Sequence, residues 1–151
     1  MNLKVVALDL ERTLISDSLS ADPRPGLFDF LTFCAERFER IALFTSVETP
    51  DAREVLESLA GGGHVPLEFM ARLEYVEWLG EYKDLTFIPN AAPGEILLID
   101  DDIGWVRPDQ RDRWIPIAGW DRGADSELPR VRKILESWLA ATAGCCSSFE
   151  S

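Results

Sequence analysis

The sequence predicts an α/β fold: a single domain with a mainly parallel five-stranded sheet and helices on both faces. Short apolar runs typical of buried strands alternate with segments whose apolar residues recur at helical spacing. Polar residues follow directly where several runs end, a pattern typical of the carboxyl edge of a parallel sheet. We bound the domain at 1–140 of the 151 residues, followed by a flexible C-terminal tail over 141–151 of small and polar composition.

The first half of the chain predicts two strands and two helices. The run over residues 4–8 is almost entirely apolar, which indicates a strand buried on both faces. Apolar residues from Leu27 to Phe38 recur at helical spacing and predict the first helix. Residues 41–44 form the second strand. Thr49 is the expected N-cap of the second helix, with Pro50 in its first position, and three consecutive glycines end it.

The second half predicts three further strands and a closing helix. Residues 65–70 are apolar enough for a third strand, which a proline keeps short or at an edge. Residues 71–95 show no clear pattern. The run over 96–99 is the clearest strand after the first, and residues 114–117 form a short fifth one. From about residue 126 the apolar side chains fall on one helical face and predict the last helix.

Two of the predicted strands end in carboxylates. Asp9 and Glu11 follow the first strand, and Asp100 and Asp101 follow the fourth. Because the carboxyl ends of parallel strands meet at one edge, we expect these acids to lie together. Carboxylates this close repel one another unless some are protonated or a cation neutralises them. Oxygen ligands without a suitably placed histidine or cysteine favour a hard cation such as Mg²⁺.

Hydroxyl and amine groups complete the same edge. Thr45 and Ser46 end the second strand just before a helix, where hydroxyls and backbone N–H groups favour an anion. Lys83 adds a positive charge. A cluster of acids that suits magnesium, next to a strand end that suits an anion, is typical of proteins that bind or transfer phosphoryl groups.

The order of these residues resembles the four motifs of the haloacid dehalogenase superfamily, in which most members are phosphatases. Finer details resemble the branch of NLI-interacting-factor-like and RNA polymerase II C-terminal-domain phosphatases. The resemblance covers roughly residues 4–139 and implies a three-layer, Rossmann-like domain with a minimal cap or none. The matching segments are Asp9-Leu10-Glu11-Arg12-Thr13, Leu43-Phe44-Thr45, Lys83-Asp84-Leu85, Asp100-Asp101 and Asp125-Ser126-Glu127-Leu128.

The resemblance implies a catalytic role for each group. Asp9 attacks phosphorus and forms an aspartyl-phosphate. Glu11 protonates the leaving oxygen and then activates water. Thr45 and Ser46 bind the phosphoryl oxygens, and Lys83 binds phosphate and offsets its charge.

The resemblance also implies the metal ligands. Mg²⁺ is held by Asp9, the backbone carbonyl of Glu11, and the side chains of Asp100 or Asp101. Two positions depart from the usual pattern. Most of the superfamily carries Asp in place of Glu11, although the enolase-phosphatase branch resembles this chain there. Close relatives usually carry Glu in place of Arg12, which affects substrate choice at the mouth of the site.

The cysteines and the single histidine indicate no further site. Cys34 lies on an apolar helical face and is expected in the core, while the Cys145–Cys146 pair matches no metal spacing. His64, beside the glycines, is expected in a loop, which excludes Ser-His-Asp chemistry unless it reaches a nucleophile. Trp78 and Trp105 are expected to line the cleft. With no signal peptide evident, a reducing cytoplasm is the simplest location.

These observations predict a Mg²⁺-dependent phosphatase with an open site, suited to a phosphoprotein or another extended substrate, with a small phosphoester left open. The net charge of −12 argues against a nucleic-acid partner. No window approaches the roughly 20 apolar residues of a membrane span. Oligomeric state cannot be read from the pattern. One alternative is a catalytically weak or inactive binding module of the same fold; a more distant one is a phosphoacceptor receiver domain, which places its acidic pair first and its lysine last.

Overall fold

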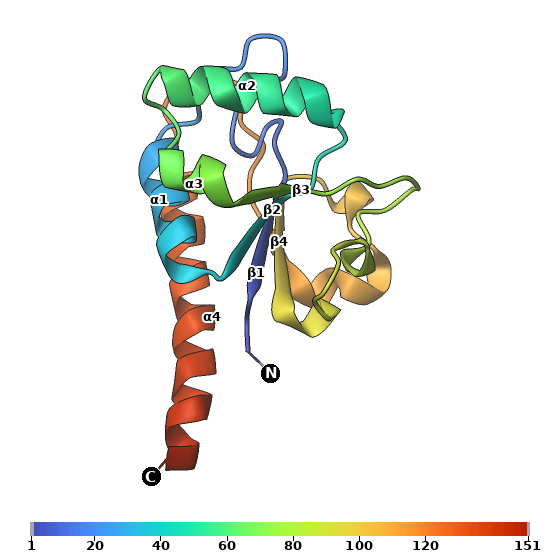
Figure 1. Cartoon of the computed structure of the whole chain (residues 1–151), viewed down its shortest axis with the longest axis vertical. Coiled ribbons are helices and arrows are strands. Elements are labelled where there is room, and N and C mark those ends of the chain that lie inside the picture. Colours follow the sequence, from blue (N-terminus) through green and yellow to red (C-terminus); the bar gives the residue numbers. More distant parts are fainter. Residues whose placement is uncertain (1, 151) are drawn as a thin grey trace.

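The protein is built on one parallel sheet. The structure, a computed structural model, describes residues 2–150, and their side chains as far as residue 142. The strand order is β3-β2-β1-β4-β5, and all four pairings are parallel (Figure 1). This confirms the predicted α/β fold. The strands are β1 Val5–Leu8, β2 Arg40–Leu43, β3 Leu73–Tyr75, β4 Ile96–Asp100 and β5 Trp114–Pro116.

The helices divide between the two faces of this sheet. The α-helices are α1 Leu27–Arg37, α2 Thr49–Gly61, α3 Leu67–Arg72 and α4 Glu127–Glu150. Short 3₁₀ helices are η1 Leu85–Phe87, η2 Pro93–Glu95, η3 Ile103–Trp105 and η4 Pro108–Arg113. Figure 1 shows α1 and α4 on one side of the strands and the later 3₁₀ helices on the other. The second face is therefore covered by short turns and loops.

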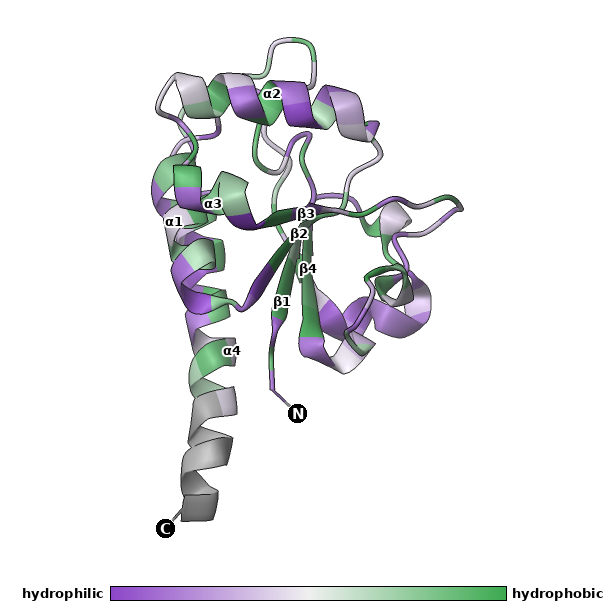
Figure 2. Ribbon diagram, viewed as in Figure 1, coloured by the Kyte–Doolittle hydropathy of each residue, from purple (hydrophilic) through white to green (hydrophobic). Residues whose placement is uncertain are grey.

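Strand β1 shows why the sheet needs both layers. Val6 and Leu8 belong to the core cluster on the α-helical side, whereas Val5 and Ala7 belong to the cluster under the 3₁₀ segments. Successive strand residues face opposite sides, so an unbroken apolar run buries both. Figure 2 shows the central strands as hydrophobic along this run. Burial on both faces is what fixes β1 in the middle of the sheet.

The third predicted strand is wrong in position and type. Residues 65–70 form most of α3, and the strand is the following segment, β3. Pro66 occupies the N-cap position of α3, and the helix buries Phe69 while Leu67 stays 77% exposed. A short apolar run fits a one-sided helix as well as a strand, so packing against α1 decides between them. Helix α2 also begins one residue earlier than expected, with Glu48 rather than Thr49 as the N-cap.

The chain ends in a long helix. Helix α4 continues through Glu150, with Leu128, Val131 and Leu135 buried against the core. The predicted tail over 141–151, like the Cys145–Cys146 pair, falls largely outside the residues with described side chains, so the domain bounds stay a prediction. Within the described part of the chain, no helix is both long and apolar enough to cross a membrane.

Candidate active site

The carboxyl edge of the sheet gathers the acidic residues. Leu8 of β1 pairs with Ile99 of β4, so the next residues along each strand, Asp9 and Asp100, emerge side by side. The backbone N–H of Asp9 also donates to the carbonyl of Ile99 at 3.0 Å. Carboxylate oxygens of Asp9, Asp100 and Asp101 lie within 4.8 Å of one another. The adjacency of β1 and β4 thus creates a dense negative cluster.

Lys83 lies between two of these acids. Its Nζ donates to Asp9 Oδ1 at 2.9 Å and to Asp100 Oδ2 at 2.5 Å, and the residue is only 1% exposed. The lysine comes from the segment between β3 and η1, where its backbone N–H donates to the carbonyl of Trp105. One ammonium group is therefore shared by both buried carboxylates.

Burial and charge shift the pKa values of all three groups. Burial raises the pKa of Asp9 to about 7, although Lys83 pulls it down. Burial also raises the pKa of Asp100 against the same opposing charge. For Lys83, burial works against the charged form, but the attraction of both carboxylates outweighs it and raises the pKa. One cation cannot fully offset two carboxylates, so the lysine stays charged and extra protons bind the acids.

The loop after β1 orients the nucleophile candidate. Thr13 Oγ1 donates to Asp9 Oδ2 at 2.8 Å, so both Asp9 oxygens accept hydrogen bonds. Arg12 adopts a left-handed backbone, with φ of 64°, and its Nε lies 3.5 Å from Asp101 Oδ2. A Cβ added to Gly119 would lie 2.7 Å from the Arg12 guanidinium and 3.1 Å from Asp101. Only a residue without a side chain leaves this ion pair undisturbed.

Glu11 lies in the same loop but outside the acidic cluster. Its Oε2 accepts the backbone N–H of Ser18 at 2.7 Å, which ties the carboxylate to the neighbouring turn. The side-chain oxygens that cluster as candidate metal ligands come from the three aspartates alone, within the described residues. The structure thus brings the three aspartates and Lys83 together, and it holds the Glu11 carboxylate at the Ser18 backbone rather than in this cluster.

Thr45 and Ser46 lie at the end of β2, beside a hollow of about 500 Å³. Thr45 is buried, and its hydroxyl accepts the backbone N–H of Val47 at 3.1 Å. Its carbonyl accepts the indole N–H of Trp78 at 2.8 Å. Ser46 is exposed. Trp78 and Trp105 line this hollow together with the two hydroxyl residues, which agrees with their expected place in a cleft.

Asp84 holds the segment that presents Lys83. Its carboxylate accepts hydrogen bonds from the Thr86 backbone N–H, the Gln110 side chain and the Arg107 guanidinium. Burial alone would raise the pKa of Asp84, but these hydrogen bonds outweigh it and lower the pKa to about 2. The carboxylate therefore stays ionised and links the lysine segment to η4.

Arg24 is a buried support that the sequence did not reveal. It is 1% exposed and donates to the carbonyls of Arg12, Thr13 and Ala118 and to both oxygens of Asp125. It thereby ties the loop that orients Asp9 to the chain just before α4. An arginine between two prolines in a polar loop normally indicates solvent exposure, so no local signal distinguishes it.

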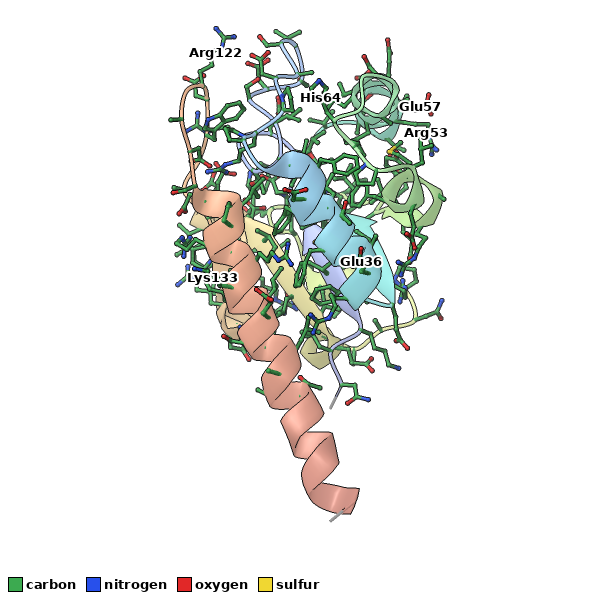
Figure 3. The ribbon with its side chains drawn as sticks, turned by 90° about the vertical axis from the view of Figure 1, so that its left-hand side faces the viewer. Glu36, Arg53, Glu57, His64, Arg122 and Lys133 are labelled. Atoms are coloured by element: carbon green, nitrogen blue, oxygen red, sulfur yellow. The ribbon has the colours of Figure 1, made fainter. Side chains whose placement is uncertain are left out.

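Replacing Arg24 by alanine is expected to lower the free energy of unfolding by about 3 kcal/mol, because several buried acceptors lose their donor. Urea unfolding followed by tryptophan fluorescence measures this. Arg122→Ala is the matched control: Arg122 is 67% exposed in its side chain and lies at the periphery of the molecule (Figure 3). A loss for Arg24→Ala no larger than for the control would contradict a supporting role.

Comparisons with known proteins agree with this arrangement. A family model described as NLI interacting factor-like phosphatase matches residues 4–145. The fission yeast RNA polymerase II CTD phosphatase Fcp1, in a variant bound to beryllium fluoride, is similar to 93% of the chain with a TM-score of 0.57 and 15% identity. A second Fcp1 structure, described as an essential RNA polymerase II CTD phosphatase, matches 94% of the chain with a TM-score of 0.56 and 15% identity.

These matches cover almost all of this chain but only part of each solved structure. The chain spans about half of the two solved structures, 51% and 49% of their lengths. At such low identity the likeness shows a shared fold. No curated protein sequence matches the chain significantly.

Proposed function

Because the chain belongs to the family of NLI interacting factor-like phosphatases, we propose that it hydrolyses a phosphate monoester through an aspartyl-phosphate on Asp9. The observation that carries the proposal is the buried contact of Lys83 with Asp9 and Asp100 at the carboxyl edge of the sheet. Burying a carboxylate beside two further acids costs free energy even when a lysine and a threonine bind it, so such a group is typical of a functional site rather than of a structural core. The same groups suit attack on phosphorus.

Asp9 is the nucleophile of the proposed reaction. Lys83 and Thr13 each hold one of its oxygens, which restricts the orientation of the carboxylate. An Asp9 oxygen forms a bond to phosphorus as the bond from phosphorus to the ester oxygen breaks, and Glu11 supplies the proton to the leaving oxygen. Glu11 then removes a proton from water, whose oxygen attacks the same phosphorus, releases inorganic phosphate and restores Asp9.

The phosphoryl oxygens of the substrate need hydrogen-bond donors in addition to the attacking carboxylate. Thr45 and exposed Ser46 offer hydroxyls at the end of β2, next to the hollow that a leaving group would occupy. Lys83 adds a positive charge close to the attacking carboxylate. Preorganised donors of this kind stabilise the charge that develops on a transferring phosphoryl group.

The donor set fits Mg²⁺. When all three are ionised, Asp9, Asp100 and Asp101 carry three negative charges against one from Lys83. Arg12 at Asp101 is more than half exposed, where solvent screens it. Oxygen ligands with an excess of negative charge suit a hard divalent cation. Asp9, Asp100, Asp101 and the Glu11 carbonyl would hold it. When bound, Mg²⁺ neutralises the charge between carboxylate and phosphate.

Hydrolysis of para-nitrophenyl phosphate tests the proposal. We expect turnover by the purified protein with Mg²⁺ and its loss in EDTA, restored by excess Mg²⁺. Beryllium fluoride should inhibit, since it accompanies the fission yeast relative. A folded protein that shows no turnover at several pH values, with Mg²⁺ and at high enzyme concentration, would contradict a phosphatase and favour the binding module. The cytoplasmic location and the choice between protein and small-molecule substrates stay predictions.

Magnesium should also stabilise the fold, and more so as the pH rises. Saturation at a hundred times Kd is expected to add about 2.7 kcal/mol to the free energy of unfolding. Because burial raises the pKa of Asp9 to about 7, a bound proton competes with the metal below that pH. The Mg²⁺ affinity should then fall by about tenfold per pH unit. Thermal unfolding with and without Mg²⁺ across this range measures both effects.

Two variants sharpen this measurement. Asp100→Asn removes a buried acid of the cluster and should abolish most of the stabilisation by Mg²⁺. Asp112→Asn removes an exposed acid outside the cluster and should leave it unchanged. Equal responses to Mg²⁺ in both variants would show that the ion binds elsewhere.

A further inference from the structure

The hollow beside Thr45 has aromatic walls. Trp78 and Trp105 meet nearly at right angles, with ring centroids 5.7 Å apart and an interplanar angle of 89°. Trp105 also lies beside the catalytic edge, because Lys83 Nζ is 5.8 Å from its ring centroid. A group in this hollow would therefore sit next to a phosphate bound at Asp9. The hollow would therefore hold the leaving group of the substrate or the part of the substrate next to it.

The charge of this hollow is negative. Glu48 and Glu77 lie among the residues that line it, and none of the described lining residues is basic. Both glutamates are exposed and line the hollow, so a cation that enters can reach them. Aromatic faces and carboxylates together favour a cation, since the ring face attracts positive charge and the carboxylates pair with it. An acidic group beside the phosphate would be repelled.

The hollow continues along the surface. A second depression of about 630 Å³ shares Glu77, Trp78 and Leu79 with the first and adds Phe87. Leu79 is 90% exposed and Phe87 40% exposed, so this part of the surface is apolar. It lies on the segment after β3, which runs out from the sheet in Figure 1. The two depressions together offer more room than a small phosphoester fills, which favours a larger substrate such as an extended chain.

We propose that the substrate is a phosphorylated protein segment with an arginine or lysine next to the phosphorylated residue. The basic side chain enters the hollow that the two indoles line and pairs with Glu48 and Glu77. An adjoining apolar residue lies on Leu79 and Phe87. The proposal rests on the proposed phosphatase function and names its substrate class. The overall charge of −12 adds long-range attraction for such a basic segment.

Synthetic phosphoserine peptides test this directly. Peptides of one length carry arginine, alanine or glutamate at each position flanking the phosphoserine, and kcat/KM is measured with Mg²⁺ at moderate salt. We expect arginine to exceed alanine by about tenfold at one flanking position, and glutamate to be the poorest. The double variant Glu48→Gln with Glu77→Gln should reduce the ratio of arginine to alanine peptides to near one.

The control variant is Glu36→Gln. Glu36 is exposed near the end of α1, which leads into the start of β2 and so lies toward the opposite edge of the sheet (Figure 3). Together with Glu39→Gln, at a second exposed residue, it removes the same two charges as the double variant, and the pair should leave both the peptide ratio and the hydrolysis of para-nitrophenyl phosphate unchanged. A ratio that falls equally in this control would assign the preference to net charge alone.

Two results would overturn the proposal. The first is equal kcat/KM for arginine and alanine peptides in a protein that hydrolyses para-nitrophenyl phosphate. The second is a preference for apolar flanking residues that the glutamate variants do not alter. If no ester is hydrolysed, the proposed phosphatase function fails, and the preference for a basic residue is tested separately by peptide binding, followed by tryptophan fluorescence. Tighter binding of the arginine peptide than of the alanine peptide supports the proposed role of the hollow, and equal binding overturns it.

Discussion

Replacing Asp9 by asparagine is expected to abolish turnover, by about 10⁴-fold or more, while the protein stays folded. Asparagine keeps the size of the side chain and can still accept a hydrogen bond, but its amide is no nucleophile toward phosphorus. Lys83 keeps Asp100 as a partner at 2.5 Å, so the remaining pair is neutral. The substitution therefore removes the chemistry without leaving an unpaired charge.

The stability of this variant gives an independent check. Since burial raises the pKa of Asp9, the ionised carboxylate is unfavourable in the folded protein at neutral pH. Between the unfolded-state pKa of 3.8 and the folded-state pKa of about 7, the folded protein binds more protons than the unfolded chain, so this group lowers the stability increasingly as the pH rises through that range and by a constant amount above it. Asp9→Asn should be as stable as the parent protein or more so at about pH 8 without metal.

Hydrolysis of para-nitrophenyl phosphate and urea unfolding measure the two effects on one preparation. Asp112→Asn, which changes an exposed acid in η4, is the matched control for activity and should retain it. A variant at position 9 that still turns over at more than about a hundredth of the parent rate would exclude the aspartyl-phosphate route.

Replacing Lys83 by methionine should cause the largest loss of stability, about 3–5 kcal/mol, because two buried carboxylates lose their shared cation. Methionine fills most of the volume, so the cost reflects charge rather than a cavity. Activity should fall by about 10²–10³-fold, since an electrostatic donor beside the phosphate is removed. The lysine thus supports both the fold and the proposed reaction.

The pH dependence of the stability of Lys83→Met shows whether the loss comes from unpaired charge or from altered packing. Burial raises the pKa values of Asp9 and Asp100, and without Lys83 they rise further. The folded variant therefore binds more protons than the unfolded chain, and its stability should increase as the pH falls from about 8 toward 5. Lys133→Met is the control, since Lys133 is exposed on α4 (Figure 3). A pH-independent loss at position 83 would indicate altered packing rather than unpaired charge.

Much of the fold and part of the site follow from local pattern. The apolar runs of β1 and β4 are long enough to require burial on both faces, and this makes their identity as central strands unambiguous. Parallel pairing then places Asp9 beside Asp100 without any knowledge of distances. The order of motifs also predicted the NLI interacting factor-like phosphatase family, which the family match over residues 4–145 confirms.

Other features depend on contacts between segments far apart in the sequence. Residues 65–70 are apolar in either a strand or a helix, and only packing against α1 selects α3. Lys83 reaches Asp9 across 74 positions, from a stretch without a regular pattern. Arg24 meets Asp125 across 101 positions. Periodicity reports which residues are buried, but a polar group's partner is set by the tertiary fold.

The sequence by itself therefore determined the parallel sheet, the acidic edge and the family of this protein. The tertiary structure alone decided that Lys83 is shared between Asp9 and Asp100, which arginine holds the loop after β1, and that two glutamates share a hollow with two tryptophans. The physical reason is that strand burial is a local property of a run of residues. Pairing of charges in a low-dielectric site depends on the distances between segments that the chain brings together only on folding.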